Sequence, residues 1–278
     1  MRVLTVIGTR PEAVKMAPVV AALQARPGVA LFVVATAQHR EMMDQVLRIF
    51  DITPDFDLDV MEADQSPTDV LAQVLLRLQP VLAKTQPDWL LVQGDTTTVL
   101  GAALAASYGK VKVGHVEAGL RTYDRANPFP EELNRVLADH ASTLHFAPTD
   151  TAREALLREG FAPESVHVTG NTVIDALQTI VQRPPNGRLP EAPAGRKLVL
   201  VTAHRRENHG QPIRDICMAL RELARRDDVH VIYPVHRNPN ISGPVHELLG
   251  AQPNVVLLDP VDYVTFVHLM GKAHVILT

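Results

Sequence analysis

Short runs of apolar and β-branched residues alternate along the chain with longer segments in which apolar residues recur with a helical period. The short runs predict strands over residues 2–7, 31–36, 89–93, 112–117, 144–148 and 166–170. The longer segments predict helices over residues 11–25, 39–50, 67–86, 97–108, 130–140 and 149–159. A strict alternation over 55–60 predicts one more strand, at a sheet edge. Strands that alternate with helices indicate an α/β fold, with a parallel sheet covered on both faces.

This pattern stops at residues 183–196, which hold four prolines and two glycines and show no apolar period. We interpret them as a linker between an N-terminal lobe, 1–182, and a C-terminal lobe, 197–278. In the second lobe the pattern predicts strands over 197–202, 229–235, 254–259 and 274–278, with helices over 211–226, 243–250 and 262–272. No helix follows the last strand, so we expect the second lobe to be incomplete.

Each lobe opens in the same way, with an apolar strand, a basic loop and the start of a helix. Ligands of open α/β sheets bind beyond the carboxyl ends of the strands. Two Rossmann-like lobes facing across a cleft would therefore place Arg10 on one wall and His204, Arg205 and Arg206 on the other.

The first basic loop is a candidate phosphate site. Thr9 and Glu12 fit a capping box at the start of the helix. The free N–H groups of a helix N-terminus favour anions, Arg10 adds a forked cation, and Lys15 lies about one turn further along. The alternative is a solvated arginine at a well-capped helix. The sequence contains neither the glycine fingerprint of dinucleotide-binding folds nor a P-loop.

Three acids follow predicted strands or open a helix in the first lobe. Asp95 comes directly after a strand, where it could instead be a helix N-cap. Glu117 closes an apolar strand, a costly place for an unpaired charge. Glu131 opens a helix, where dipole complementation and a pair with Arg135 are the alternative; that alternative suits Glu132 well. Acids beside a cationic site can move protons next to a carbon that loses a diphosphate.

Composition narrows the classes of function. The net charge of −4 disfavours a general nucleic-acid binder. A single cysteine, Cys217, excludes an intrachain disulfide and favours a cytoplasmic protein. No apolar run is long enough for a membrane span, so we expect no membrane association. His204, Glu207 and His209 lack the spacing of a zinc site, and we expect no metal.

Eight motifs in order make the chain resemble the non-hydrolysing UDP-N-acetylglucosamine 2-epimerases of bacteria. They are GTRPEAVKMAPVV, TAQHREMMDQVL, VQGDTTT, HVEAGLRT, NPFPEELNR, VTGNTVIDAL, VTAHRREN and YPVHRNPN. The resemblance covers the chain from Arg2 to Thr278 and implies the fold of the B-type glycosyltransferases. It also implies a homodimer formed through the first lobe.

The resemblance implies interconversion of UDP-N-acetylglucosamine and UDP-N-acetylmannosamine through 2-acetamidoglucal, without cofactor or metal. The resemblance implies roles for three groups of residues: Asp95, Glu117, Glu131 and His204 for catalysis; Arg10, Lys15 and Phe266 for UDP binding; Gln38, His39, Arg205 and His236 for a second, activating UDP-N-acetylglucosamine.

Two departures from the family pattern change these expectations. Glu41 stands where some members have a glutamine in the activator site. The chain also stops before an Asp-Ser-Gly-Gly segment that grips UDP in the family, so we expect the 278-residue chain alone to be weakly active or inactive.

Three alternatives remain open on the sequence. A hydrolysing epimerase would release UDP and N-acetylmannosamine. A B-type glycosyltransferase would use the same donor without removing the C2 proton. A UDP-sugar sensor would bind the nucleotide and leave it unchanged, and the three acids argue against it.

Overall fold

The computed structural model describes residues 1–36, 40–60, 62, 65–185, 187–203 and 208–278. The chain divides into two compact units, Met1–Ala176 and Leu177–Thr278. Each unit has its own sheet and its own buried core.

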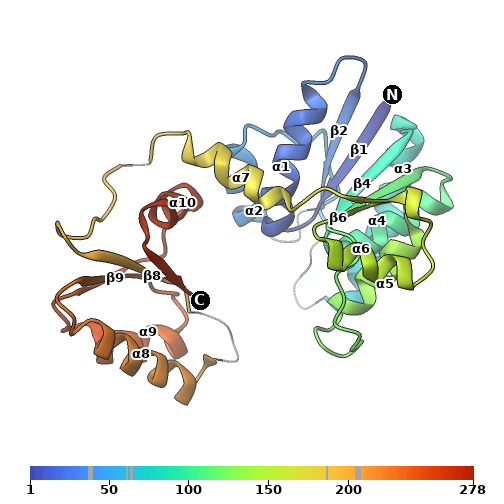
Figure 1. Ribbon diagram of the computed structural model, residues 1–278. Coiled ribbons are helices and arrows are strands. Elements are labelled where there is room, and N and C mark those ends of the chain that lie inside the picture. Colours follow the sequence, from blue (N-terminus) through green and yellow to red (C-terminus); the bar gives the residue numbers. More distant parts are fainter. Residues whose placement is uncertain (37–39, 61, 63–64, 186, 204–207) are drawn as a thin grey trace. The chain divides into compact units, whose positions relative to one another are not determined.

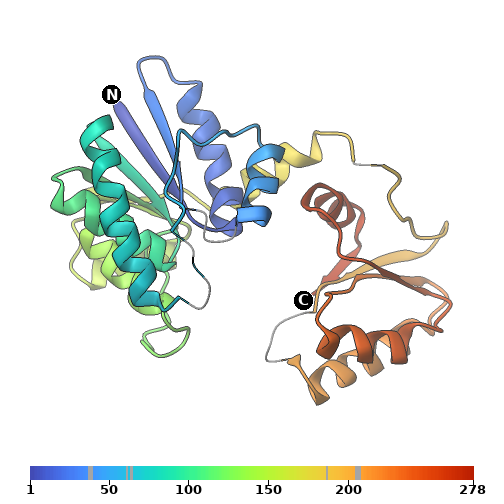
Figure 2. The same cartoon turned by 180° about the vertical axis from the view of Figure 1, so that it is seen from behind.

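Unit 1 is built on a seven-stranded parallel sheet with the order β3-β2-β1-β4-β5-β6-β7. Its strands are β1 (Arg2–Ile7), β2 (Ala30–Ala35), β3 (Phe56–Asp57), β4 (Trp89–Gln93), β5 (Lys112–Val116), β6 (Leu144–Ala147) and β7 (Val166–Val168). Its helices are α1 (Arg10–Gln24), α2 (Arg40–Ile49), α3 (Pro67–Thr85), α4 (Thr97–Tyr108), α5 (Glu131–Ala141), α6 (Asp150–Arg158) and the 3-10 helix η1 (Pro163–Ser165). Helices α1 and α2 cover one face of this sheet, and α3, α4 and α5 cover the other (Figures 1 and 2).

The helices of unit 1 begin where side chains can satisfy their free N–H groups. Ser66 and Asp69 form a capping box at α3. The Thr96 hydroxyl accepts a hydrogen bond from the Val99 N–H at the start of α4. The apolar faces of α3 and α4 pack on the sheet, and the resulting core includes fully buried Leu78.

Unit 2 holds a four-stranded parallel sheet with the order β10-β9-β8-β11. Its strands are β8 (Lys197–Val201), β9 (Val229–Pro234), β10 (Val255–Leu258) and β11 (Val275–Leu277); its helices are α8 (Gln211–Leu223), α9 (Pro239–Leu249) and α10 (Tyr263–Lys272). Side chains along β8 alternate between two cores. Val199 and Val201 pack with α8 and α9, whereas Leu198 and Leu200 pack with α10, so helices cover both faces.

The predicted α/β fold is confirmed. The edge strand predicted over 55–60 is present but shorter, as Phe56–Asp57. Two helices differ from the prediction. Helix α7 (Thr172–Val181), which spans the boundary between the units, was not predicted. Helix α9 begins at Pro239 rather than at 243, because Asn238 caps it and Pro244 is accommodated inside it. No helix in the described part of the chain is both long and apolar enough to cross a membrane.

Candidate active site

Three loops of unit 1 follow neighbouring strands at the carboxyl-end edge of its sheet. They hold Arg10 after β1, Asp95 after β4 and Glu117 after β5. Strand β1 lies between β2 and β4, so the order of the strands reverses there. Ligands of open α/β sheets bind in the crevice outside such a switch point.

The Glu117 carboxylate is surrounded by side-chain hydrogen-bond donors. Lys15 Nζ, on α1, lies 2.8 Å from Glu117 Oε1 and 2.6 Å from Oε2. Asn171 Nδ2 donates to Oε1 at 2.8 Å, and Gln93 Nε2 donates to Oε2. The side chain of Glu117 is 11% exposed, and its backbone has φ +66°. A residue other than glycine in this strained conformation is typical of functional sites.

Asp95 lies beside the same group of charges. Arg135, on α5, places Nη2 3.3 Å from Asp95 Oδ2, and Asn134 Nδ2 donates to the Asp95 carbonyl oxygen at 3.0 Å. Burial raises the pKa of Asp95, and the nearby charges of Glu131 and Glu117 raise it further, against the opposing effect of Arg135. Glu117 and Glu131 are therefore close enough for their charges to act on Asp95.

Glu132, the second acid of α5, has a structural role. Glu132 is 1% exposed and accepts hydrogen bonds from the N–H groups of Thr122 and Tyr123. It holds the loop that leads from β5 to α5. Arg135 contacts Asp95 and Glu132, and its contact with Glu131 is to the carbonyl oxygen. Glu131, at the first position of α5, is partly exposed.

Arg10 is the first residue of α1 and is partly buried. The predicted capping box is present only in part. Glu12 Oε2 accepts from the Gly8 N–H at 2.6 Å, but the Thr9 hydroxyl donates to Glu12 instead of capping the helix. The Thr96 hydroxyl also donates to Glu12, at 2.7 Å, and so ties the loop after β1 to the loop after β4.

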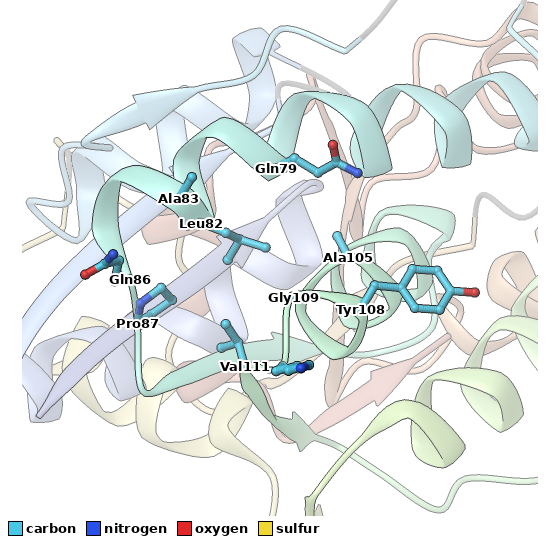
Figure 3. A pocket seen from close by; sticks show the side chains of 10 residues that line it. Gln79, Leu82, Ala83, Gln86, Pro87, Ala105, Tyr108, Gly109 and Val111 are labelled. Atoms are coloured by element: carbon cyan, nitrogen blue, oxygen red, sulfur yellow. The ribbon is translucent and has the colours of Figure 1, made fainter.

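A separate cavity of about 600 Å³ opens between the C-terminal parts of α3 and α4 (Figure 3). Leu82, Pro87, Tyr108 and Val111 are among the residues that line it. Pro87 and Val111 precede β4 and β5, so the cavity lies at the edge of the sheet opposite the acids. It is not part of the candidate active site.

Comparison with known proteins places the chain in a family. A family model described as UDP-N-acetylglucosamine 2-epimerase matches residues 21–278. The UDP-N-acetylglucosamine 2-epimerase of Salmonella typhimurium is 50% identical over 288 aligned residues, which cover 100% of this chain and 77% of that protein. The chain belongs to the UDP-N-acetylglucosamine 2-epimerase family.

Solved structures agree with membership in the epimerase family. The crystal structure of UDP-GlcNAc 2-epimerase from Neisseria meningitidis, bound to UDP-GlcNAc, is 45% identical with a TM-score of 0.84, and the match covers 99% of this chain and 77% of that one. A lipopolysaccharide outer core galactosyltransferase, 12% identical, matches with a TM-score of 0.54 over 94% of this chain and 69% of its own. That second match shows a shared fold alone.

Other predicted positions of this epimerase-family chain lie in unit 2 or outside the described residues. Phe266, on α10, is half-buried and packs on the core formed with Leu198. His236 follows β9, is exposed, and accepts a hydrogen bond at Nδ1 from the Asn238 N–H. Gln38, His39, His204 and Arg205 lie outside the described residues. Within the described residues, no group of three or more histidine, cysteine or acidic side chains is arranged to hold a metal ion.

Sequence reasoning missed the residues that hold the acids in place. Gln93 is a polar residue at the end of an apolar strand, and Asn171 lies in the motif VTGNTVIDAL, yet neither was chosen as a site residue. Both donate to Glu117. A polar residue that ends a buried strand, next to an acid that ends the adjacent one, is the signal that could have identified Gln93.

Proposed function

We propose that the protein interconverts UDP-N-acetylglucosamine and UDP-N-acetylmannosamine by removing and returning the proton at C2, without hydrolysing the nucleotide sugar. The main support for this proposal is the cluster of three acids, Asp95, Glu117 and Glu131. Glu117 forms an ion pair with Lys15, and the charges of Glu117, Glu131 and Lys15 act on Asp95 at the switch point of the sheet, where substrates of such folds bind. Relatives named as UDP-N-acetylglucosamine 2-epimerases over the whole chain support the substrate.

In the first half of the reaction, a carboxylate takes the proton from C2 and the C1–O bond breaks. The electrons of the C2–H bond form the C1–C2 double bond, and UDP leaves with the electrons of the C1–O bond. The product is 2-acetamidoglucal. In the second half, UDP adds back to C1 and C2 receives a proton on the other face, so atoms and charge balance.

The surroundings of the acids suggest which of them acts as the base and which returns the proton. Every hydrogen bond described at the Glu117 carboxylate is donated to it, an arrangement that suits an ionised base. Asp95, whose pKa is raised, is better suited to hold a proton and return it. We assign Glu131 to the same group because its charge acts on Asp95.

The remaining roles rest on the family resemblance. Arg10 and Lys15 bind the UDP part at the N-terminus of α1, where cations and free N–H groups favour phosphate. His204 acts near the diphosphate, and Phe266 packs on the uracil. Gln38, His39, Arg205 and His236 form the site for an activating second UDP-N-acetylglucosamine. We also propose a cytoplasmic homodimer that needs no cofactor.

The test is NMR of the purified protein, at high concentration and over long incubation, with UDP-N-acetylglucosamine labelled with ¹⁸O in the bond between C1 and phosphate. We expect slow formation of UDP-N-acetylmannosamine and movement of the label into non-bridging phosphate oxygens, without accumulation of free UDP. Free UDP that accumulates together with N-acetylmannosamine would identify a hydrolysing enzyme. A bound substrate that keeps both its configuration and its label position would identify a sensor and refute the proposal.

A further inference from the structure

A chain of four charged side chains crosses the interior of unit 1 behind the acids. His115, on β5, and Asp139, on α5, have 0% exposed side chains and lie 2.6 Å apart, Nδ1 to Oδ1. Arg121 Nη1 lies 2.8 Å from Asp139 Oδ2, and its Nη2 lies 2.7 Å from Glu159 Oε2, at the C-cap of α6. None of these residues belongs to the catalytic set proposed above.

Both nitrogens of the His115 ring face acceptors. Nδ1 faces the Asp139 carboxylate, and Nε2 lies 2.7 Å from the carbonyl oxygen of Gly94, which can only accept. A neutral ring donates from one nitrogen alone, so it would leave one of these short contacts without a proton. The geometry therefore calls for an imidazolium that donates on both sides.

The electrostatics agree with this geometry. Burial by itself lowers the pKa of His115, but the charge and hydrogen bond of Asp139 and the Gly94 carbonyl outweigh it and raise that pKa. Arg121 opposes the proton on His115 and supports the ionised form of Asp139. From β6, His145 Nε2 contacts the Asp139 carbonyl oxygen at 2.9 Å. These are the charged and titratable groups that the described contacts place around the pair.

The two partners hold the two loops that carry the catalytic acids. His115 holds the carbonyl oxygen of Gly94, the residue before Asp95. Asp139 Oδ2 accepts the N–H of Gly119, two residues after Glu117, at 3.3 Å. Gly94 and Gly119 have φ +86° and +83°, so both turns adopt conformations that an L side chain rarely adopts.

We propose that His115, kept doubly protonated by Asp139, is a positioning residue that fixes the distance between Asp95 and Glu117 by holding the turn beside each of them. This inference rests on the proposed function in one respect: the distance between Asp95 and Glu117 matters for catalysis only if these acids are catalytic. A buried ion pair often contributes little to stability compared with an apolar replacement, which agrees with a positioning role. A displacement of about 1 Å in such a site can slow a reaction on the order of 100-fold.

The first test uses the unaltered protein. We would record ¹⁵N NMR of its histidine rings from pH 6 to pH 9, assigning His115 by the signal that is missing in His115→Gln. We expect both ring nitrogens to be still protonated above pH ~6.5, where an ordinary exposed histidine has lost a proton. A His115 ring that becomes neutral near that pH would overturn the proposal. This readout needs no activity.

The second test compares two amides at the same position. The amide nitrogen of His115→Gln can replace Nε2 and still donate to Gly94, whereas that of His115→Asn can replace Nδ1 and reaches only Asp139. The rate at which deuterium from heavy water enters C2 of the substrate should fall on the order of 100-fold in kcat for His115→Asn, with KM little changed. His115→Gln should lose at most about tenfold. Equal rates for the two variants would overturn the proposal.

Asp139→Asn gives a further test, the pH dependence of the exchange rate. A purely structural role of the pair would not change this dependence. Without the carboxylate the ring loses its second proton at lower pH, so the exchange rate of this variant should fall as pH rises through that transition. The unaltered protein should show no such step, and a variant with no step either would contradict the proposal. If the unaltered protein exchanges no deuterium while His115 stays doubly protonated, the proposed function is refuted. The doubly protonated state proposed for His115 would still stand.

Discussion

At the scale of single residues, the site is organised by donors that face one carboxylate. Lys15, Gln93 and Asn171 come from α1, from the end of β4 and from the loop before α7, and all donate to Glu117. Together they offset the cost of holding a mostly buried charge in a backbone conformation with positive φ. The position of the Glu117 carboxylate depends on these partners, so a change at any of them should alter the chemistry more than the fold.

Asn171→Asp should shift the pH profile of the reaction. It replaces a donor 2.8 Å from Glu117 with a second carboxylate, and two adjacent carboxylates resist ionising together. We expect the acid limb of the rate profile to move upward by about one pH unit or more. Asn171→Ala is the matched control, because it removes the donor without adding charge: its rate should fall, and its acid limb should move upward less than that of Asn171→Asp. Identical profiles for the two variants would contradict this view of the site.

Glu12 should make the protein less stable as pH rises. Burial raises its pKa above the ordinary value of 4.5, against the hydrogen bonds from Gly8, Thr96 and Thr9. The folded protein therefore holds this proton more tightly than the unfolded chain. The contribution of Glu12 to the free energy of unfolding is highest below pH 4.5 and falls as pH rises toward the folded pKa.

Glu12→Gln tests this, because the amide can accept from Gly8 and donate to both hydroxyls. Urea unfolding at several pH values should show the variant gaining stability relative to the unaltered protein as pH rises from 4.5. Glu12→Ala should be destabilised at every pH, by about 1–3 kcal/mol for each buried group left without a partner. A constant difference between Glu12→Gln and the unaltered protein would refute the assignment.

At the scale of elements, the end of β5 depends on a close contact with α6. A Cβ on Gly119 would lie 2.3 Å from the Ala152 carbonyl oxygen and 2.9 Å from Leu156 Cδ1. Glycine is needed there both for its φ of +83° and for this approach of backbone to helix. The contact fixes where the loop after Glu117 can run.

Gly119→Ala should therefore destabilise unit 1 by about 3 kcal/mol or more, because the clash is with backbone and cannot be relieved by a rotamer change. Gly28→Ala is the control: Gly28 has nearly the same φ, +80°, with nothing within 4 Å of the added Cβ. It should cost only about 1–2 kcal/mol. Chemical denaturation measures both variants, and equal losses would show that the contact with α6 is unimportant.

The elements also show how far sequence reasoning reaches. The strands of unit 1 were predicted because each is a short apolar run, and the edge position of 56–57 followed from its alternation. The grouping of Asp95 with Glu117 was predictable because both end adjacent parallel strands. Helix α7 was missed. The hydrogen bond from Asn171 to Glu117 and the His115–Asp139 pair could not be predicted, because such pairings depend on tertiary contacts between residues far apart in the chain.

At the scale of the whole molecule, each unit has the means to fold by itself. Unit 1 buries a large core around β1, β4, α3 and α4, and unit 2 buries cores on both faces of its sheet. The described residues of 182–196 are mostly exposed, Leu189 being buried at 7% exposure. This segment includes residues 183–196, which the prolines predict to be a linker, whereas the division between the units falls earlier, after Ala176.

Limited digestion with trypsin should cut first in this segment, at the exposed Arg188. We expect two fragments that resist further digestion and keep cooperative thermal unfolding. Lys84 and Lys110, near the ends of helices in unit 1, provide internal comparison sites that should be cut much later. Rapid loss of either fragment after the first cut would show that its unit is not stable alone.

The central claim is that acids of unit 1 move the proton at C2, and deuterium incorporation at C2 of UDP-N-acetylglucosamine in heavy water tests it most directly. The unaltered protein should incorporate deuterium, and Glu117→Gln should do so about 100-fold more slowly or worse, because it removes an acid–base group. Glu164→Gln, at an exposed glutamate of η1, should match the unaltered protein. Epimerisation that leaves C2 free of deuterium, or a Glu117→Gln variant as fast as the unaltered protein, would contradict the account.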